Sequence, residues 1–169
     1  MIRSTKLLSI IILLLFLFSC KNDKTSSQSE IFANLELNRG DLLLCGDPNF
    51  GEVSFSLSCR YDLREKFNLG LTLIHSFEYA EAEKVFVSIL DEDSECLMAY
   101  WATAMSILNH PLSFKQNPES LKRGEELLKV AKKLTPNNER EKDYIKAIKI
   151  LKQRCEFLGE DKLFKRRPN

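Results

Sequence analysis

The stretch FNLGLTLIHSFEYAEAEKVFVSIL, residues 67–90, holds the pattern that decides the fold. Apolar residues recur in it every three or four positions, which is the spacing that places side chains on one face of a helix. We therefore predict two consecutive helices. The first begins near Tyr61, and the second extends from about Tyr79 to Leu90.

Start signals predict where these helices and three later ones begin. Asp62 and Glu65 have the spacing of a capping box, in which side chains accept hydrogen bonds from the free amides of the first turn. Three further helices are expected: from about Glu95 to Asn109 after a Ser94 cap, from Asn117-Pro118 to about Leu134, and from Asn138 to about Phe157, with Glu141 in the cap and Gly159 as the stop.

The helical region repeats itself along the chain. For the first helix of each pair, a shift of 34 residues places Phe67 on Trp101, Gly70 on Ala104 and Leu71 on Met105. For the second helix, a shift of 42 places Ala82 on Gly124, Phe86 on Leu128 and Ile89 on Ala131. An insertion of eight residues between Asn109 and Asn117 accounts for the difference. A step of about 34 residues between helical hairpins is the period of the tetratricopeptide repeat (TPR).

Individual residues resemble those of the TPR family. Leu69-Gly70 resembles its Leu-Gly pair on the first helix, Ala82 and Phe86 resemble its small and aromatic residues on the second, and Ala131 and Pro136 resemble its closing Ala and Pro. A small residue lets two helices approach where they cross, and a large one opposite fills the space. The resemblance implies an all-α fold of about two TPR-like hairpins and a capping helix, preceded by a short extended segment.

The segment from Gly51 to Leu151 is also similar to the opening of a family of exported bacterial TPR proteins. The similar residues are Val53-Ser54-Phe55, Cys59, Phe67-Asn68-Leu69-Gly70, His75-Ser76-Phe77, Cys96 to Trp101, His110-Pro111-Leu112 and Arg140 to Ile145. That family has no assigned enzymatic activity and its members are usually longer, so the resemblance implies a shortened member without catalysis.

Residues 1–19 are typical of a bacterial lipoprotein signal peptide. Their apolar run, from Leu7 to Phe18, is too short to cross a bilayer as a helix. It ends in Leu17-Phe18-Ser19-Cys20, which resembles the lipobox that directs acylation of its cysteine. Several acyl chains, each contributing ~0.8 kcal/mol per buried CH₂ group, would make Cys20 a stable membrane anchor.

The chain is expected to divide into five parts. Residues 21–30 are polar, as in a flexible linker, and Val53 to Cys59 alternate between apolar and polar, as in a half-buried extended segment. The parts are a signal peptide (1–19), a flexible tether (20–40), an extended segment packing on the repeats (41–60), a TPR-like helical domain (61–158) and a basic tail (159–169).

In TPR arrays the first helix of each hairpin lines a concave groove, which is the usual binding surface. By resemblance, the groove and partner-binding residues are Arg64, Phe67, Leu71, Ile74, Met98, Trp101, Met105 and Leu108. A bare apolar surface of this kind favours aggregation. Two hypotheses explain it: the Val53 to Cys59 segment fills the groove as a built-in lid, or an apolar peptide or ligand fills it.

Four cysteines besides Cys20 allow three pairings: Cys45, Cys59, Cys96 and Cys155. An exported protein can hold disulfides, and Cys59 and Cys96 each stand just before a first helix. Neighbouring hairpins could therefore bring these two together. Buried thiols are the alternative.

The two histidines, His75 and His110, end successive first helices, where a histidine can bind free carbonyl groups. A metal site combining them with Cys96 has no closely spaced ligand pair in its favour, so we expect no metal and no cofactor. No phosphate-binding glycine loop or hydrolase motif is present, and we expect no enzymatic activity. The acid pairs Glu81/Glu83 and Glu125/Glu126 are expected on solvated helix faces.

The nearly balanced charge of the chain does not favour a nucleic-acid partner. Without Arg3 and Lys6 of the signal peptide, 23 of the 25 basic residues remain against 24 acidic ones. We therefore expect a membrane-anchored module that binds a protein or peptide, or acts as a scaffold, in the cell envelope. Lys21 after the anchor favours the outer membrane, facing the periplasm or the cell surface. The alternatives are an envelope assembly factor and an accessory metal-binding subunit using His75, His110 and Cys96.

Overall fold

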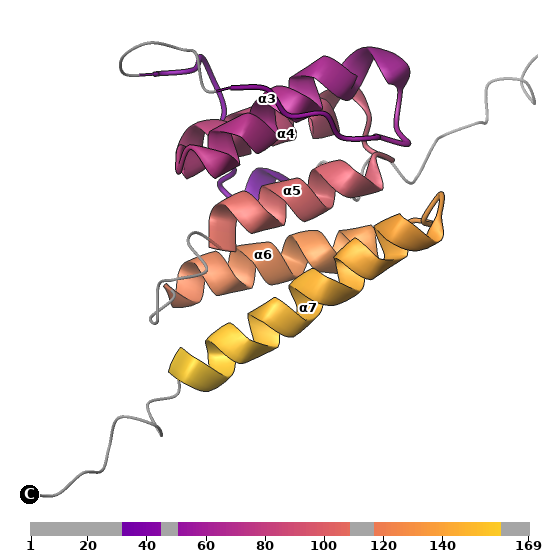
Figure 1. The fold of residues 1–169 in the computed structure, drawn as a ribbon. Helices are drawn as coiled ribbons and strands as arrows, with labels where there is room; N and C mark the ends of the chain where they lie inside the picture. The colour runs from indigo at the N-terminus through magenta and orange to yellow at the C-terminus, as the bar shows by residue number, and fades with distance from the viewer. Residues whose placement is uncertain (1–31, 45–50, 109–116, 160–169) are drawn as a thin grey trace, which may run out of the picture.

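The computed structural model of the chain describes residues 32–44, 51–108 and 117–159. Over these residues the regular structure is helical, without strands, which confirms the all-α class. The elements are a short 3-10 helix, η1 (Tyr61–Leu63), followed by α3 (Arg64–His75), α4 (Tyr79–Glu92), α5 (Leu97–Leu108), α6 (Pro118–Ala131) and α7 (Glu139–Gly159). Figure 1 shows α3 to α6 stacked in sequence order, with α7 lying across the end of the stack.

Two of the expected helix starts are confirmed by their caps. The side chain of Asn117 accepts a hydrogen bond from the Glu119 amide at 3.0 Å, and Pro118 is the first helical residue of α6. At the start of α7, Asn138 Oδ1 accepts from the Glu141 amide at 3.0 Å, and the Glu141 carboxylate accepts from the Asn137 amide at 2.8 Å. The free amides of both first turns are thus partly satisfied by side chains.

Several expected boundaries differ from the structure by two or three residues, and at two helix starts the reason is a competing side-chain contact. Asp62 caps no helix because its carboxylate pairs with Arg60, and α3 begins only at Arg64. The third helix begins at Leu97 rather than Glu95, since the Asp93 carboxylate accepts the Glu95 amide at 3.1 Å and holds a turn there. The fourth ends at Ala131 and not at Leu134.

The turn between α3 and α4 is closed by backbone hydrogen bonds. Phe77 has a positive φ of 65°, and its amide donates to the Ile74 carbonyl at 3.1 Å. The Glu78 amide donates to the Leu73 carbonyl at 2.9 Å. This pair of bonds is a Schellman motif, which usually has glycine at the left-handed position. It reverses the chain within three residues, so α4 returns along α3.

Both hairpins place a glycine where two helices meet most closely. A Cβ atom built on Gly70 of α3 would lie 2.5 Å from two ring carbons of Phe86 on α4. A Cβ built on Gly124 of α6 would lie 3.4 Å from Leu108 on α5. The first hairpin therefore requires glycine for close packing, whereas the second has room for a methyl group.

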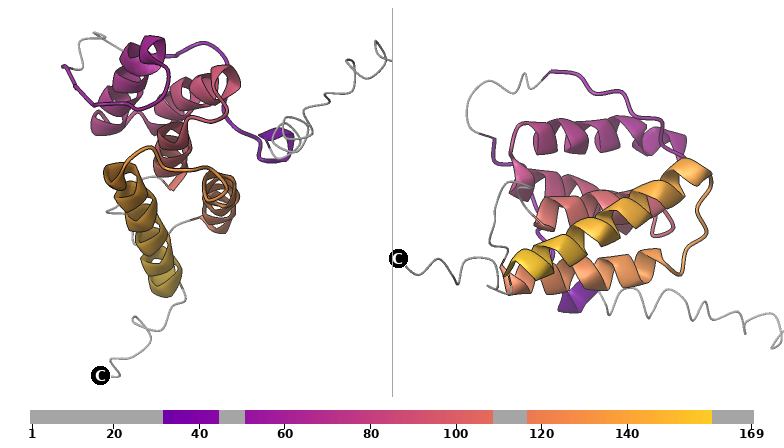
Figure 2. Two further views of the ribbon diagram at one scale, coloured as in Figure 1. Left: turned by 90° about the vertical axis from the view of Figure 1, so that its right-hand side faces the viewer. Right: turned by 60° about the horizontal axis from the view of Figure 1, so that its bottom comes forward.

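Helix α5 lies at the centre of the fold. It is apolar on every side, and most of its residues are buried, including Met98, Tyr100 and Ala104 at 0% exposure. Helices α4, α6 and α7 pack against it. In Figure 2 the first described residues, in indigo, lie on the side of α5 away from α7. The expectation that a helix of this composition is buried is confirmed.

We expect Gly70→Ala to lower the free energy of unfolding by about 1–3 kcal/mol, because the added methyl group overpacks against a ring that cannot move into solvent. Gly124→Ala is the matched control. Alanine favours a helix by about 1 kcal/mol over glycine, so the control should be neutral or stabilising. Denaturant unfolding of both variants, followed by circular dichroism, measures the difference.

Adding Phe86→Leu to Gly70→Ala should recover part of the loss, since it removes the ring that the methyl group meets. Equal effects of the two glycine substitutions would show that the close contact between α3 and α4 does not limit stability.

Candidate functional site

The residues expected to line a concave groove are largely covered. Phe67, Leu71, Met98 and Leu108 are buried, and Arg64, Ile74, Trp101 and Met105 are half-buried. Leu108 lies against Gly124 of α6, inside the second hairpin. Two segments of the chain itself cover Phe67 and Trp101. They are the extended residues 51–59, which we name the lid, and the first turns of α7.

The lid places alternate side chains onto α3. The Phe55 ring lies 5.4 Å from the Phe67 ring, centroid to centroid, and Leu57 is buried. Its main chain is held as well, because the Phe55 amide donates to Asn68 Oδ1 at 3.0 Å. Within the described ranges the lid forms no sheet ladder, so side-chain packing and Asn68 replace a strand partner.

Side chains of α7 and of its N-cap residue also contact the lid, on the side away from α3. The guanidinium of Arg140 lies 4.5 Å above the Phe55 ring and also donates to the Ser56 carbonyl. Asn138 Nδ2 donates to Ser58 Oγ at 2.8 Å. The Tyr144 ring meets the Phe55 ring at 5.7 Å and the Trp101 ring at 4.8 Å, both edge-on. The groove faces of α3 and α5 are therefore closed by one connected set of contacts.

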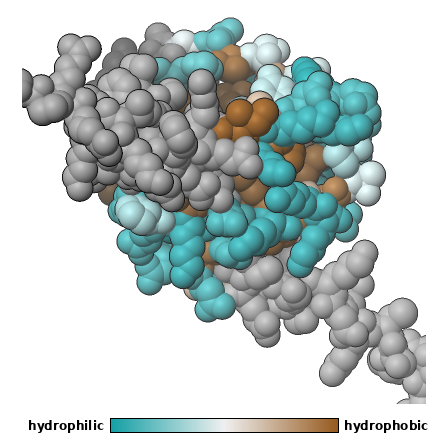
Figure 3. Space-filling model, turned by 90° about the horizontal axis from the view of Figure 1, so that it is seen from below, coloured by the Kyte–Doolittle hydropathy of each residue, from teal (hydrophilic) through white to brown (hydrophobic). Residues whose placement is uncertain are grey.

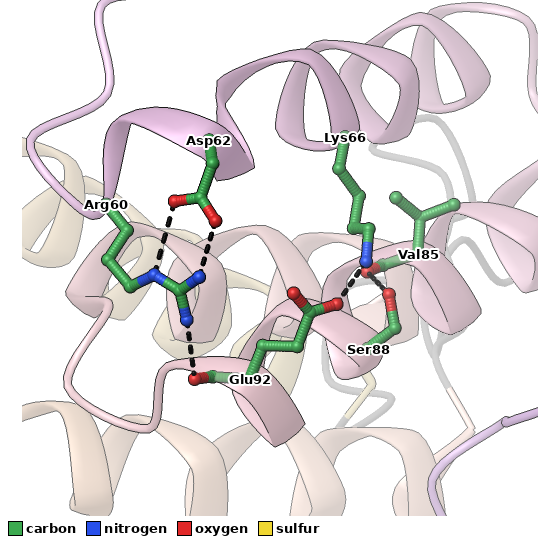
Figure 4. A network of polar contacts seen from close by, with 6 residues as sticks. All are labelled: Arg60, Asp62, Lys66, Val85, Ser88 and Glu92. Carbon is green, nitrogen blue, oxygen red and sulfur yellow. Dashed lines mark hydrogen bonds and ion pairs between the residues drawn. The ribbon is translucent and has the colours of Figure 1, made fainter.

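A disulfide bond joins the end of the lid to the start of α5. It links Cys59 and Cys96, whose Cα atoms lie 5.2 Å apart. Figure 4 shows the polar contacts beside it: the Arg60 guanidinium donates to the Asp62 carboxylate and to the Glu92 carbonyl, and Lys66 pairs with the Glu92 carboxylate. These contacts connect η1 and α3 to the end of α4.

A second segment, residues 32–44, packs on the other side of α5; it begins with helical residues 32–34 and continues without regular structure, and we name it the strap. Its Phe32 ring lies 5.9 Å from the Tyr100 ring, and Leu35 and Leu37 are buried. Arg39 pairs with Asp91 on α4 at 2.9 Å. The range 20–40 was expected to be a flexible tether, and its described part differs from that expectation. The polar composition of residues 21–30 does not extend to Phe32, Leu35 and Leu37.

Two buried carboxylates on α4 hold the strap. Glu83, 3% exposed, accepts from the amide and the side chain of Asn38 at 3.0 and 2.8 Å and pairs with Arg123 of α6. Glu81, 7% exposed, accepts from the Leu43 amide at 2.8 Å and pairs with Lys84 at 3.0 Å. Buried charges need such partners.

The expectation that Glu81 and Glu83 lie on a solvated face is wrong. The strap covers that face of α4, and Arg123 reaches over it to the Leu35 carbonyl at 2.8 Å. The acids are spaced as on any polar helix face, so the sequence of α4 carries no signal of their burial. The one available signal lies in the strap itself, where Phe32, Leu35 and Leu37 are spaced for a buried face.

The remaining candidate residues are not gathered into a site by the described structure. His75 is the last residue of α3 and is exposed. Cys20, Cys45 and His110 lie outside the described residues, as do the signal peptide and residues 160–169 of the basic tail. Large exposed apolar side chains come from separate elements, namely Leu43, Tyr61, Leu69, Phe77 and Ile150. From below, apolar atoms show between hydrophilic ones and not as one broad patch (Figure 3).

Comparisons of the chain with models of protein families, with characterised proteins and with solved structures gave no match. Among the helices described, none has both the length and the apolar character needed to cross a membrane. The function is therefore inferred from the contacts of the chain's own residues.

Phe55→Ala should loosen the lid. We expect it to lower the free energy of unfolding by about 1–3 kcal/mol and to expose Phe67 and Trp101 to solvent, because the lost ring packs on Phe67 and is packed by Tyr144. The emission of Trp101, the one tryptophan of the chain, should shift to longer wavelength, and binding of an apolar dye should increase. Leu43→Ala removes an exposed apolar side chain and serves as the control. Unchanged emission and dye binding in Phe55→Ala would show that the lid does not cover the groove.

Acid should release the strap. Burial by itself would raise the pKa of the Glu81 carboxyl, but the Leu43 amide and the Lys84 ammonium outweigh it and hold that pKa below the ordinary value of 4.5. The stabilisation is therefore complete above pH 4.5 and is lost as the pH falls through the lower folded pKa. Hydrogen exchange at the Leu43 amide, corrected for its intrinsic rate, should accelerate over this range. Glu81→Gln should remove the pH dependence, and the same acceleration in that variant would exclude Glu81 as the cause.

Proposed function

We propose that this chain is a lipid-anchored interaction module of the bacterial cell envelope, built from TPR-like hairpins. The support from packing is that each hairpin has a small residue against a large one. Gly70, on the first helix, meets Phe86 in one hairpin, and Gly124, on the second helix, meets Leu108 in the next. First helices contact each other, α3 with α5 and α5 with α7, as expected where they line a common groove.

The main support for the proposal is that the lid packs across α3, on the surface expected to line the groove. An extended stretch of chain lies across α3, with alternate apolar side chains inward and a main-chain amide bonded to Asn68. This is the way in which a groove recognises an extended peptide: side chains enter apolar sites while polar side chains bind the peptide backbone. The groove therefore has the chemistry to hold an extended apolar segment, and the lid is its resident occupant.

A partner has access beside the lid. A cleft of about 500 Å³ lies between the start of the lid and α3, lined among others by Val53, Asn68, Leu69 and Thr72. Leu69 is 39% exposed there. We infer that a peptide or protein partner first contacts the module at this cleft, alongside the lid.

The anchor remains a proposal that rests on the sequence. The lipobox-like Leu17-Phe18-Ser19-Cys20 and the apolar run before it support acylation of Cys20. Phe32, the first residue of the strap, is buried in the folded part. Residues 21–31 therefore separate Cys20 from the folded part. Fully extended, they span at most about 40 Å. The module would therefore work close to the membrane surface.

The alternatives have less support. An envelope assembly factor rests on analogy of fold alone. An accessory metal-binding subunit using His75, His110 and Cys96 is disfavoured, because the Cys96 sulfur is bonded to Cys59 and His75 is an exposed residue at a helix end.

Photo-cross-linking in intact cells tests the proposal. A photoreactive residue at Leu69 should capture a discrete envelope partner, since that position faces the open cleft. The same residue at Ile150, an exposed apolar position on α7, is the matched control and should not capture it. Cys20→Ala should abolish acyl labelling, move the protein out of the membrane fraction and reduce the adduct at Leu69. A wild-type protein without acyl label, or the same adducts from both positions, contradicts the proposal.

A further inference from the structure

Three potential metal ligands meet where α4 turns into α5. The sulfurs of Cys59 and Cys96 and a carboxylate oxygen of Asp93 all lie within 4.8 Å of one another. Asp93 and Cys96 belong to the same tight turn, in which the Cys96 amide donates to the Asp93 carbonyl at 3.1 Å. A turn that presents two ligands three residues apart is a common half of a metal site, and Cys59 at the end of the lid supplies the third ligand.

We propose that, once the disulfide is reduced, Cys59, Cys96 and Asp93 bind a zinc-like divalent cation. Two thiolates and a carboxylate suit a borderline-soft ion better than calcium or magnesium, which take oxygen ligands. Bond lengths of about 2.3 Å to sulfur and 2.0–2.2 Å to oxygen place tetrahedral ligands about 3.5–3.8 Å apart. The present cluster, with Cα atoms of the cysteines 5.2 Å apart, reaches that geometry by side-chain rotation.

The chemistry requires an external dithiol reductant. That dithiol donates two electrons to the S–S bond, becomes a disulfide itself and leaves Cys59 and Cys96 as two thiols. The cation then forms two metal–sulfur bonds and displaces one proton from each thiol. The oxidised and metal-bound states exclude each other, because each uses both sulfurs.

The surroundings fit a cation with an open coordination position. A hollow of about 440 Å³ lies beside the cluster and reaches Cys59 and Asp93, so a water molecule or a ligand can take the fourth place. Two thiolates and one carboxylate would leave a divalent ion with one net negative charge, and Arg60 and Lys133 line the same hollow. Cys96 directly precedes α5, whose free amide end favours a thiolate.

The proposal does not depend on the interaction role proposed above. In both chemical states the lid keeps a covalent or coordinate bond to the start of α5. In a reducing environment, a metal ion would thus replace the disulfide as the link between the lid and the start of α5.

Cobalt(II) binding by the full chain tests the proposal, because thiolate–cobalt absorption reports the number of sulfur ligands. The starting protein carries Cys20→Ser, Cys45→Ser and Cys155→Ser, which remove the three other thiols of the chain. After reduction it should bind one equivalent of cobalt with two thiolate ligands, and zinc should displace it. The oxidised protein should bind none.

Asp93→Asn should weaken cobalt binding at least tenfold while leaving the oxidised protein and its disulfide intact. Cys59→Ser should remove one thiolate contribution. Circular dichroism of the reduced protein is recorded with and without zinc. The proposal is overturned by absent thiolate bands after reduction, by equal affinity in Asp93→Asn, or by loss of helical signal that zinc does not restore.

Discussion

Helix α5 cannot be exposed on any side, and most other features of this structure follow from that constraint. Its residues are apolar on all sides. Helices α4 and α6 cover two of these sides, and two further faces remain to be covered. Trp101 on one face meets Tyr144 of α7, and Tyr100 on the other meets Phe32 of the strap. The extended segments at either side of the hairpins are therefore as much a part of the core as the helices are.

The two covers are held by different kinds of interaction. The lid is fixed by aromatic packing and a covalent bond, through Phe55 and the bond between Cys59 and Cys96. The strap is fixed by hydrogen bonds to the carboxylates of Glu81 and Glu83, and the lowered pKa of Glu81 makes the bond from the Leu43 amide sensitive to acid. Reducing conditions thus act on one face of α5 and acid on the other. With both covers in place, the large apolar side chains that stay exposed in the described residues come from separate elements.

The sequence predicted what local periodicity can encode. The helix pattern, the caps at Asn117 and Asn138 and the small residue at Gly70 all depend on neighbours within a few positions, or on one repeat step. The burial of Glu81 and Glu83 was not predicted, because their distant partners Leu43, Asn38 and Arg123 lie 38 to 45 residues away along the chain, in the strap and on α6. The spacing of Phe32, Leu35 and Leu37 indicates that the strap is buried, but no pattern in the sequence identifies α4 and α5 as its partners.

The bond from Arg123 to the Leu35 carbonyl joins residues 88 positions apart, and this separation sets an order of events during biosynthesis. A polypeptide emerges from the ribosome amino end first, so residues 32–44 are made long before the arginine that secures them. Until α6 has appeared, the Leu35 carbonyl and the Glu83 carboxylate lack the Arg123 guanidinium. The hairpin of α3 and α4 is complete much earlier. The contacts that secure residues 32–44 are therefore complete only when a helix made much later is present.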